Sequence, residues 1–324
     1  MEYRNLGRTG LKVSELCMGT MQFGWTADKS TSHEILSEAF EHGINFIDTA
    51  DIYSRWVDGN PGGVSETIIG EWIQESGYER SKIILATKVR GVMGDGPNDE
   101  GLSRAHILAE VENSLKRLNT DYIDLYQTHW YDENTPIEET LAAFDDLVRQ
   151  GKVRYIGCSN YPAWRLMQAL WYADRDRVPG YSCIQPHYSL VHRKDFEREL
   201  ADVCRTYGIG VIPYSPLGGG FLTGKYKKGG AEIDSQRANG VKKYYSESNW
   251  QLLEKMGQIG SENGDKSISQ VALAWLLSDP LISSPIIGPR TIEQLQDNLG
   301  AVGFRLSPEE KQTLDDASDP DQHN

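Results

Sequence analysis

Residues 122–158, YIDLYQTHWYDENTPIEETLAAFDDLVRQGKVRYIGC, contain one complete unit of secondary structure. A short apolar run at 122–127 is followed by a segment with helical spacing at 136–150 and a second short run at 153–158. Pro136 stands at the start of the helical segment and Gly151 follows its end, the usual places of these residues around a helix. The stretch therefore predicts a strand, a helix and a second strand.

The same alternation extends outward over almost the whole chain. Eight such strand–helix units, joined by right-handed crossovers, favour a closed (β/α)8 TIM barrel over other α/β folds. The predicted strands lie at 16–19, 45–48, 83–88, 122–127, 153–158, 183–185, 210–214 and 281–287, and the predicted helices at 32–42, 65–76, 103–118, 136–150, 162–172, 195–207, 246–262, 267–278 and 291–302.

An open doubly wound sheet is the alternative fold. That fold carries a G-x-G-x-x-G turn after its first strand, whereas residues 18–21 here read MGTM. No repeat or linker divides the chain, so we expect residues 1–324 to form one barrel domain. We also expect an N-terminal hairpin at 1–13, an extra C-terminal helix at 307–317 and a frayed tail at 318–324.

Composition excludes several classes of function. The 324 residues include 33 Lys and Arg against 47 Asp and Glu, a net charge of −14. Such an acidic chain repels nucleic acid and anionic membrane surfaces, so neither is an expected partner. The four cysteines are scattered without a C-x-x-C pair, no His cluster has metal-ligand spacing, and no apolar leader opens the chain. These features predict a cytoplasmic protein without a metal.

Ionisable side chains stand at the ends of successive predicted strands. Asp48 ends the second strand with Tyr53 in the next loop, Lys88 ends the third, and His129 ends the fourth. The carboxyl ends of barrel strands carry the catalytic groups of such folds. A Tyr hydroxyl titrates near pH 10, and a neighbouring ammonium held by a carboxylate favours its ionisation. The four residues therefore predict a proton donor beside an imidazole.

Several longer motifs carry a family resemblance. They are LCMGT (16–20), GINFIDTADIY (43–53), TK (87–88), LNTDYIDL (118–125) leading to His129, and GKVRYIG (151–157). Over about residues 3–317 the chain resembles the aldo-keto reductases. The resemblance implies reduction of an aldehyde or ketone by hydride transfer from NADPH, with NADH as the alternative cofactor. Asp48, Tyr53, Lys88 and His129 match the family's catalytic tetrad, in which Tyr53 would be the general acid.

The resemblance also implies a cofactor site along the same rim. Amide groups after the fifth and sixth strands would hold a carboxamide, Tyr214 would stack on the nicotinamide, and the glycine-rich loop after it would contact the phosphates. A helix start near Arg290 would bind the adenosine end, with Arg290 on a 2′-phosphate. The expected cofactor residues are Gly19, Thr20, Met21, Asp48, Ser159, Asn160, Gln185, Tyr214, Ser215, Pro216, Leu217, Gly219, Lys225, Arg237, Gly288, Arg290, Gln294 and Asn298.

The substrate side departs from the commonest family pattern. The loop at 54–62 is long, a Trp-Tyr pair follows His129, and the Gly-rich loop at 90–102 is long enough for a lid. An aromatic-walled pocket for a small carbonyl compound, an aromatic aldehyde or a sugar, is expected from Trp25, Tyr53, Trp56, His129 and Trp130.

Two other functions remain open at this point. The chain also fits an NADPH-sensing regulatory subunit resembling potassium-channel β subunits, which the family includes, and a homo-oligomer is compatible with either function. A lyase that forms a Schiff base on Lys88 is disfavoured by Asp48 and Tyr53 beside it.

Overall fold

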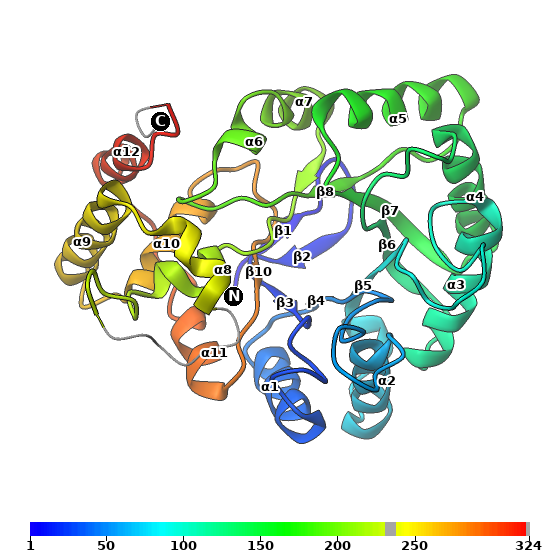
Figure 1. Ribbon diagram of the computed structural model, residues 1–324, viewed down its shortest axis with the longest axis horizontal. Coiled ribbons are helices and arrows are strands. Elements are labelled where there is room, and N and C mark those ends of the chain that lie inside the picture. Colours follow the sequence, from blue (N-terminus) through cyan, green and yellow to red (C-terminus); the bar gives the residue numbers. More distant parts are fainter. Residues whose placement is uncertain (231–237, 322–324) are drawn as a thin grey trace.

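Parallel strands occupy the centre of the computed structural model, which describes residues 1–230 and 238–321, and helices surround them (Figure 1). The strands pair in the order β10-β3-β4-β5-β6-β7-β8-β9. They are β3 (Cys17–Gly19), β4 (Phe46–Asp48), β5 (Ile84–Val89), β6 (Ile123–Thr128), β7 (Val153–Ser159), β8 (Cys183–Gln185), β9 (Gly210–Val211) and β10 (Ile286–Ile287).

Contacts between the two outermost strands close the sheet. Val211 bridges Ile282 in parallel, Ser283 N donates to Val211 O at 2.8 Å, and Ile286 N donates to Pro213 O at 2.9 Å. The predicted (β/α)8 barrel is thereby confirmed. The last two strands are shorter than predicted, because single bridges replace a regular ladder where the barrel closes.

The helices follow the strands as expected, and their ends match the local sequence. Ser103 caps α3 by accepting from His106 N, and Ser267 and Ser307 form capping boxes. No helix in the described part of the chain has the length and apolarity to span a bilayer. The helices are α1 (Lys29–Glu41), α2 (Val64–Ser76), α3 (Arg104–Arg117), α4 (Ile137–Arg149), α5 (Ala163–Asp176), α6 (Lys194–Glu197), α7 (Leu200–Tyr207), α8 (Ala238–Val241), α9 (Glu247–Glu262), α10 (Ile268–Leu277), α11 (Ile292–Leu299) and α12 (Pro308–Ala317), with short 3₁₀ turns η1 (Arg80–Lys82), η2 (Gly218–Thr223) and η3 (Lys242–Tyr244).

One predicted helix is wrong in its continuity. The segment 195–207 forms α6 and α7, and Glu199 between them has φ −141°. Phe196, Leu200 and Cys204 keep a spacing of four residues through the break and are all buried. The apolar periodicity therefore gives no signal of the interruption.

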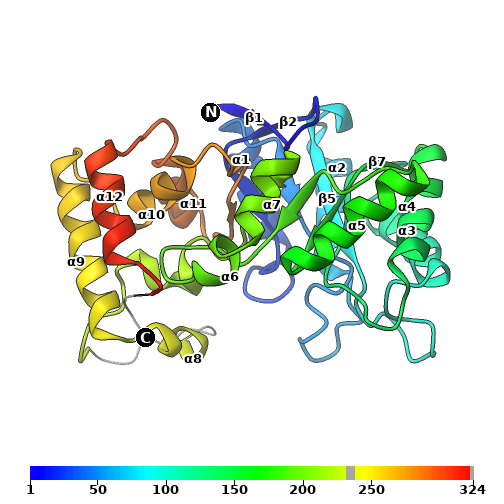
Figure 2. The same cartoon turned by 90° about the horizontal axis from the view of Figure 1, so that it is seen from above.

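The predicted N-terminal hairpin is confirmed and covers one end of the barrel. Strands β1 (Tyr3–Asn5) and β2 (Lys12–Ser14) pair antiparallel, and Figure 2 shows them at the end opposite the long loops. The hairpin thus leaves the carboxyl ends of the strands open. Its apolar residues join an inner core made of Leu6, Val13, Cys17, Phe46, Ala86, Leu125, Cys183, Ile212 and Ile286.

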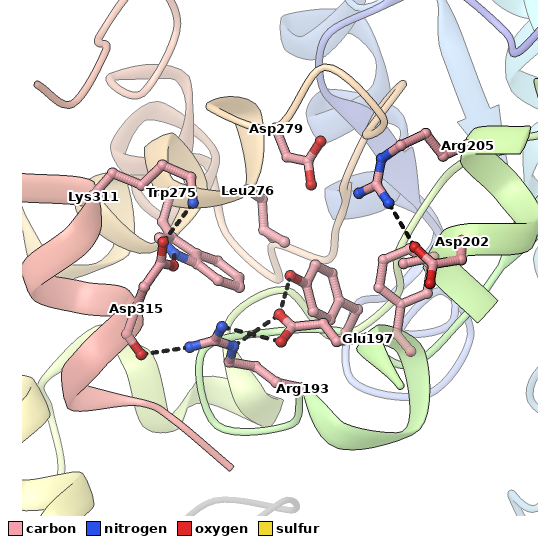
Figure 3. A pocket seen from close by; sticks show the side chains of 12 residues that line it. Arg193, Glu197, Asp202, Arg205, Trp275, Leu276, Asp279, Lys311 and Asp315 are labelled. Carbon is pink, nitrogen blue, oxygen red and sulfur yellow. Dashed lines mark hydrogen bonds and ion pairs between the residues drawn. The ribbon is translucent and has the colours of Figure 1, made fainter. Parts of the chain in front are cut away.

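The C-terminal helix α12 packs beside α9 and is held by a half-buried arginine (Figures 2 and 3). Arg193 donates to Asp315 O at 2.7 Å and to Ser318 Oγ at 2.8 Å, and pairs with Glu197. These groups line a hollow of about 180 Å³ between α6, α7, α10 and α12. Ser318, where the frayed tail was expected to begin, is buried and anchored instead, and residues 322–324 lie outside the described part.

Candidate active site

Lys88 is the centre of the predicted tetrad. Its side chain is fully buried in β5, and Nζ donates to Asp48 Oδ2 at 2.6 Å, Thr49 O at 2.7 Å and Tyr53 OH at 3.0 Å. Burial disfavours the charged form, but Asp48 and Tyr53 outweigh it, so the pKa of Lys88 is raised. An ammonium with three acceptors stays charged. A Schiff base needs the neutral, nucleophilic amine, so Lys88 is unsuited to form one.

The hydroxyl of Tyr53 remains protonated at neutral pH. Burial raises its pKa above the ordinary value near 10, while the ammonium of Lys88 acts in the opposite sense. The sequence predicts that Lys88 favours the phenolate of Tyr53. Lys88 does lower the pKa of Tyr53, but burial raises it by more, so the net shift is upward. A buried, protonated Tyr beside a fixed cation can donate a proton and hold the phenolate that results.

Asp48 is fixed on both oxygens. Oδ2 accepts from Lys88, and Oδ1 accepts from Gln127 Nε2 at 3.0 Å and Gln185 Nε2 at 2.9 Å. Gln127 was not among the predicted site residues. It stands two positions before His129, and period-two alternation along the strand could have placed both on the same face.

His129 follows β6 and lies beside Tyr53. The two rings meet edge to face with centroids 5.8 Å apart. Burial, then the charges of Lys88 and Arg90, keep the pKa of His129 well below 6.5, so the imidazole is neutral. Its Nδ1 is buried and has no hydrogen-bond partner among the described residues. A neutral imidazole with an unused nitrogen suits a site that a bound oxygen completes.

The five residues predicted to line the substrate pocket form one continuous series of ring contacts. Trp25 meets Trp56 at 5.7 Å, Trp56 meets Tyr53 at 6.2 Å, Tyr53 meets His129, and His129 stacks on Trp130 at 3.9 Å. Trp56 and Trp130 are 46% and 42% exposed. Aromatic faces thus remain accessible beside the buried tetrad.

The amide-bearing residues adjoin the tetrad. Asn160 Nδ2 donates to His129 O at 3.0 Å, Ser159 Oγ donates to Gln185 O at 2.8 Å, and Tyr214 OH donates to Asn160 Oδ1 at 3.0 Å. The structure therefore brings the residues after β7, β8 and β9 together at one edge.

The end of β3 joins the same edge. Gly19 is in register with Asp48, Thr20 Oγ1 donates to Asp48 O at 2.9 Å, and half-buried Met21 follows. Gln22, which the sequence did not single out, donates to Gly19 O at 2.8 Å and to Pro289 O at 2.9 Å. This side chain ties the first strand of the barrel to the segment after the last.

Two histidines that the sequence did not indicate support Tyr214. The ring of His187 is stacked on Tyr214 at 5.1 Å and on His192 at 3.8 Å, and His192 pairs with Asp195 at 3.1 Å. The nearly parallel rings fix the plane of Tyr214. No sequence signal marks this stack, because it depends on where the loops after β8 and β9 cross.

The glycine-rich loop has the geometry of a phosphate cradle. Pro216 is buried and Leu217 half-buried, and Gly218, Gly219 and Gly220 follow with φ of 56°, 66° and 101°. Lys225 Nζ lies 3.5 Å from the position that a Cβ on Gly220 would take. A backbone open to close approach beside an ammonium fits a pyrophosphate. Ser215, before the loop, also has positive φ, and Arg237 lies outside the described residues.

The predicted adenosine site lies at the start of α11. Gly288 is exposed, and Arg290 N donates to Gln294 Oε1 at 2.9 Å. The guanidinium of Arg290 has no ion-pair partner within residues 1–230 and 238–321. Gln294 is exposed whereas Asn298 is buried, so the two amides predicted to face one ligand sit in different surroundings.

Comparison with known proteins identifies the family. The model described as the aldo/keto reductase family matches residues 15–319. The chain belongs to this family. An uncharacterized oxidoreductase of Bacillus subtilis, YrpG, is 45% identical over 98% of this chain and 95% of its own length. A probable voltage-gated potassium channel subunit beta of Arabidopsis thaliana is 38% identical over 93% and 91%, and the protein tas of Escherichia coli is 34% identical over 95% and 94%.

Membership of the aldo/keto reductases agrees with the barrel and with the motifs read from the sequence. The family and the oxidoreductase relative support an oxidoreductase that acts on small molecules.

Proposed function

We propose that this protein reduces an aldehyde or ketone to an alcohol by hydride transfer, with NADPH as donor and Tyr53 as general acid. The observation that carries the proposal is the buried ammonium of Lys88, which holds Asp48 and Tyr53 beside the neutral ring of His129. The nicotinamide supplies the hydride when bound, and the protein supplies orientation and proton transfer.

The residues divide the proton chemistry among them. Tyr53 donates its hydroxyl proton to the substrate oxygen as negative charge develops there, and Lys88 stabilises the phenolate that remains. Asp48 keeps Lys88 in place through the 2.6 Å contact. His129, neutral and with an unused buried nitrogen, orients the carbonyl oxygen toward Tyr53. Proton donation of this kind typically contributes about 10²–10⁴-fold in rate.

The cofactor-binding residues follow the edge described above. Ser159, Asn160 and Gln185 would hold the carboxamide, Tyr214 the nicotinamide face, and the loop at 215–220 with Lys225 the phosphates. Arg290 would pair with the 2′-phosphate of NADPH, because its guanidinium holds no carboxylate in the described part of the chain. We further propose a single barrel domain acting in the cytoplasm.

Replacement of the general acid tests the reaction. Tyr53→Phe is expected to lower kcat for aldehyde reduction by about 10²-fold or more, while the Kd for NADPH changes less than about twofold. NADPH oxidation by absorbance gives the first quantity and fluorescence titration the second. Undiminished turnover in the variant would remove Tyr53 from the role of acid.

A regulatory subunit is the second candidate, because two plant relatives at 38% and 36% identity are named as probable potassium channel β subunits. It predicts tight NADPH binding, a stable tetramer and slow turnover of every carbonyl tested. Sedimentation and an aldehyde panel separate the two candidates, since an enzyme turns over at least one class of aldehyde whatever its assembly.

A further inference from the structure

Arg90 leaves the barrel beside His129. It directly follows β5, and the register pairs Val89 with Thr128, so the next residue on each strand is Arg90 and His129. His129 N donates to Val89 O at 3.0 Å, which extends the ladder to this point. Neighbouring strands are about 4.8 Å apart, so these two residues emerge side by side at the rim that carries the tetrad.

The guanidinium of Arg90 has no carboxylate of its own. Its Nε is buried without a hydrogen-bond partner, and no Asp or Glu among the described residues lies within ion-pair distance. Other part-buried arginines differ, since Arg80 holds Asp124 at 2.8 Å and Arg193 holds Glu197 at 2.8 Å. A buried guanidinium nitrogen without a partner is costly unless something else supplies one.

The two acidic side chains near Arg90, Asp132 and Asp51, form no ion pair with it. Asp132 accepts from Leu102 N and Thr135 Oγ1 on one oxygen and from Asn134 N on the other. Burial, and then the charge of Glu66, raise the pKa of Asp51 well above its usual range, which disfavours the ionised form of that carboxyl. The charge of Arg90 helps to lower the pKa of Asp132, but no ion pair joins the two side chains, and the same charge also acts on His129.

The backbone of Arg90 is also strained. Its φ is +132°, in the region that favours glycine, and its carbonyl accepts from Gly101 N at 3.2 Å. A long cationic side chain at such a position costs conformational energy. Strain of this kind concentrates where a side chain must be aimed at a ligand.

We propose that Arg90 binds an anionic group of the substrate, so that the preferred substrates are aldehydes or ketones carrying a carboxylate or a comparable anion. The inference rests on the proposed carbonyl reduction and names its substrate class. The planar guanidinium can pair with a carboxylate through two hydrogen bonds while Tyr53 and His129 hold the carbonyl. The ring of Trp130 stacked on His129 leaves an aromatic face beside the same position.

A matched pair of aldehydes tests the inference. The substrates are 4-carboxybenzaldehyde and its neutral methyl ester, with 4-formylbenzenesulfonate to separate a carboxylate requirement from a general anion requirement. The wild-type protein is expected to prefer the acid by at least about tenfold in kcat/KM. Arg90→Gln is expected to lower this ratio about tenfold, mainly through KM, and Arg90→Lys to restore part of it.

Arg104→Gln is the control for loss of one positive charge, because Arg104 is exposed at the start of α3 and pairs with Asp146. It is expected to leave the ratio within about twofold. Equal kcat/KM for acid and ester in the wild type, or an equal fall for both in Arg90→Gln, would overturn the inference while turnover itself upholds carbonyl reduction.

Binding provides a readout that is independent of turnover. Calorimetry with 4-(hydroxymethyl)benzoate and with its methyl ester compares the charged and neutral products on the wild type and on Arg90→Gln. Arg90→Lys, which keeps the charge, replaces Arg90→Gln if that variant does not fold. Tighter binding of the charged product, reduced in the Arg90 variants, supports the site even if no aldehyde is reduced. Equal binding of both products contradicts it.

Discussion

Single side chains in the site act through fixed hydrogen bonds. Lys88 makes three, Asp48 accepts three from Lys88, Gln127 and Gln185, and Tyr214 reaches Asn160 through one. Because Lys88, Asp48 and the two glutamines are buried, each of their donors or acceptors left without a partner would cost about 1–3 kcal/mol. The hydrogen bonds therefore hold these side chains in fixed positions around Tyr53.

Arg290 is the residue that we propose to discriminate between the two nicotinamide cofactors. Arg290→Ala is expected to raise the Kd for NADPH by about tenfold or more, because a charge-assisted pair with the 2′-phosphate is lost. The Kd for NADH, which lacks that phosphate, is the internal control and is expected to change little. Fluorescence titration of both cofactors measures the effect, and an equal loss for the two would show that Arg290 does not contact the phosphate.

The stacked histidines predict a pH dependence of stability. Burial lowers the pKa of His187 from 6.5 to about 4. Between pH 6.5 and about pH 4 this histidine binds a proton in the unfolded chain but not in the folded one. Stability is therefore lost as the pH falls below 6.5. The free energy of unfolding should decrease by at most about 1.4 kcal/mol per pH unit from this group.

Urea unfolding at about pH 7.5 and pH 5 measures the effect. His187→Gln is expected to show the smaller decrease, while His129, whose pKa is also lowered, contributes to the decrease in both proteins. Parallel decreases in wild type and variant would contradict the assignment to His187.

At the scale of elements, the C-terminal helix α12 is attached to the barrel by hydrogen bonds of side chains. Arg193, just before α6, contacts the last turn of α12, and Trp275 in α10 donates to Asp315 Oδ1 at 2.7 Å (Figure 3). The hollow between these helices is lined by ion pairs, among them Lys311 with Asp315. Several of the polar side chains that line the hollow bind one another, and these contacts hold α12 against α6 and α10.

Arg193→Met tests this attachment. The variant is expected to lose about 2–4 kcal/mol of stability, because the carboxylate of Glu197 and the end of α12 lose their donor while the side-chain volume is kept. Amide exchange in residues 308–317 should rise with it. Arg198→Met is the control, since Arg198 is exposed and its contact with Asp321 spans 4.0 Å. A change as small as the control's, within about 0.5 kcal/mol, would contradict the role.

At the scale of the whole molecule, the barrel is closed at one end by the hairpin and open at the other. Gly7 turns with φ +55° between the hairpin strands and lies against the backbone of Gly210 in β9, of Ser182 before β8 and of Gly208 after α7. Figure 2 shows the long loops after the strands at the end opposite the hairpin. The tetrad, the aromatic series and Arg90 stand at the strand ends and in the loops on that side. The hairpin thus decides which end can receive a ligand.

Gly7→Ala is expected to destabilise the protein by about 2–4 kcal/mol, because a Cβ would meet Ser182 O at 2.5 Å, Gly208 O at 2.8 Å and Gly210 N. Gly10→Ala is the matched control in the same hairpin, where a Cβ meets nothing within 4 Å. Thermal and urea unfolding compare the two. Similar stabilities for both variants would show that the hairpin is not tightly packed on the barrel.

The sequence by itself determined the order of strands and helices and the class of fold. Apolar periodicity and terminal residues such as Ser103 and Gly151 are local signals, and local signals locate elements. The positions of Asp48, Lys88 and His129 at successive strand ends were readable for the same reason. Once the strands are parallel, their carboxyl ends must share one edge, so four residues distant in sequence could be expected to meet.

Only the tertiary structure decided which polar groups are satisfied. The second amide on Asp48, the histidine stack behind Tyr214 and the unpaired guanidinium of Arg90 depend on distances between residues far apart in the chain. The break between α6 and α7 and the short strands at the closure likewise leave the apolar pattern unchanged. Periodicity records which face of an element is buried, whereas hydrogen bonding and charge pairing depend on the neighbours that folding brings to that face.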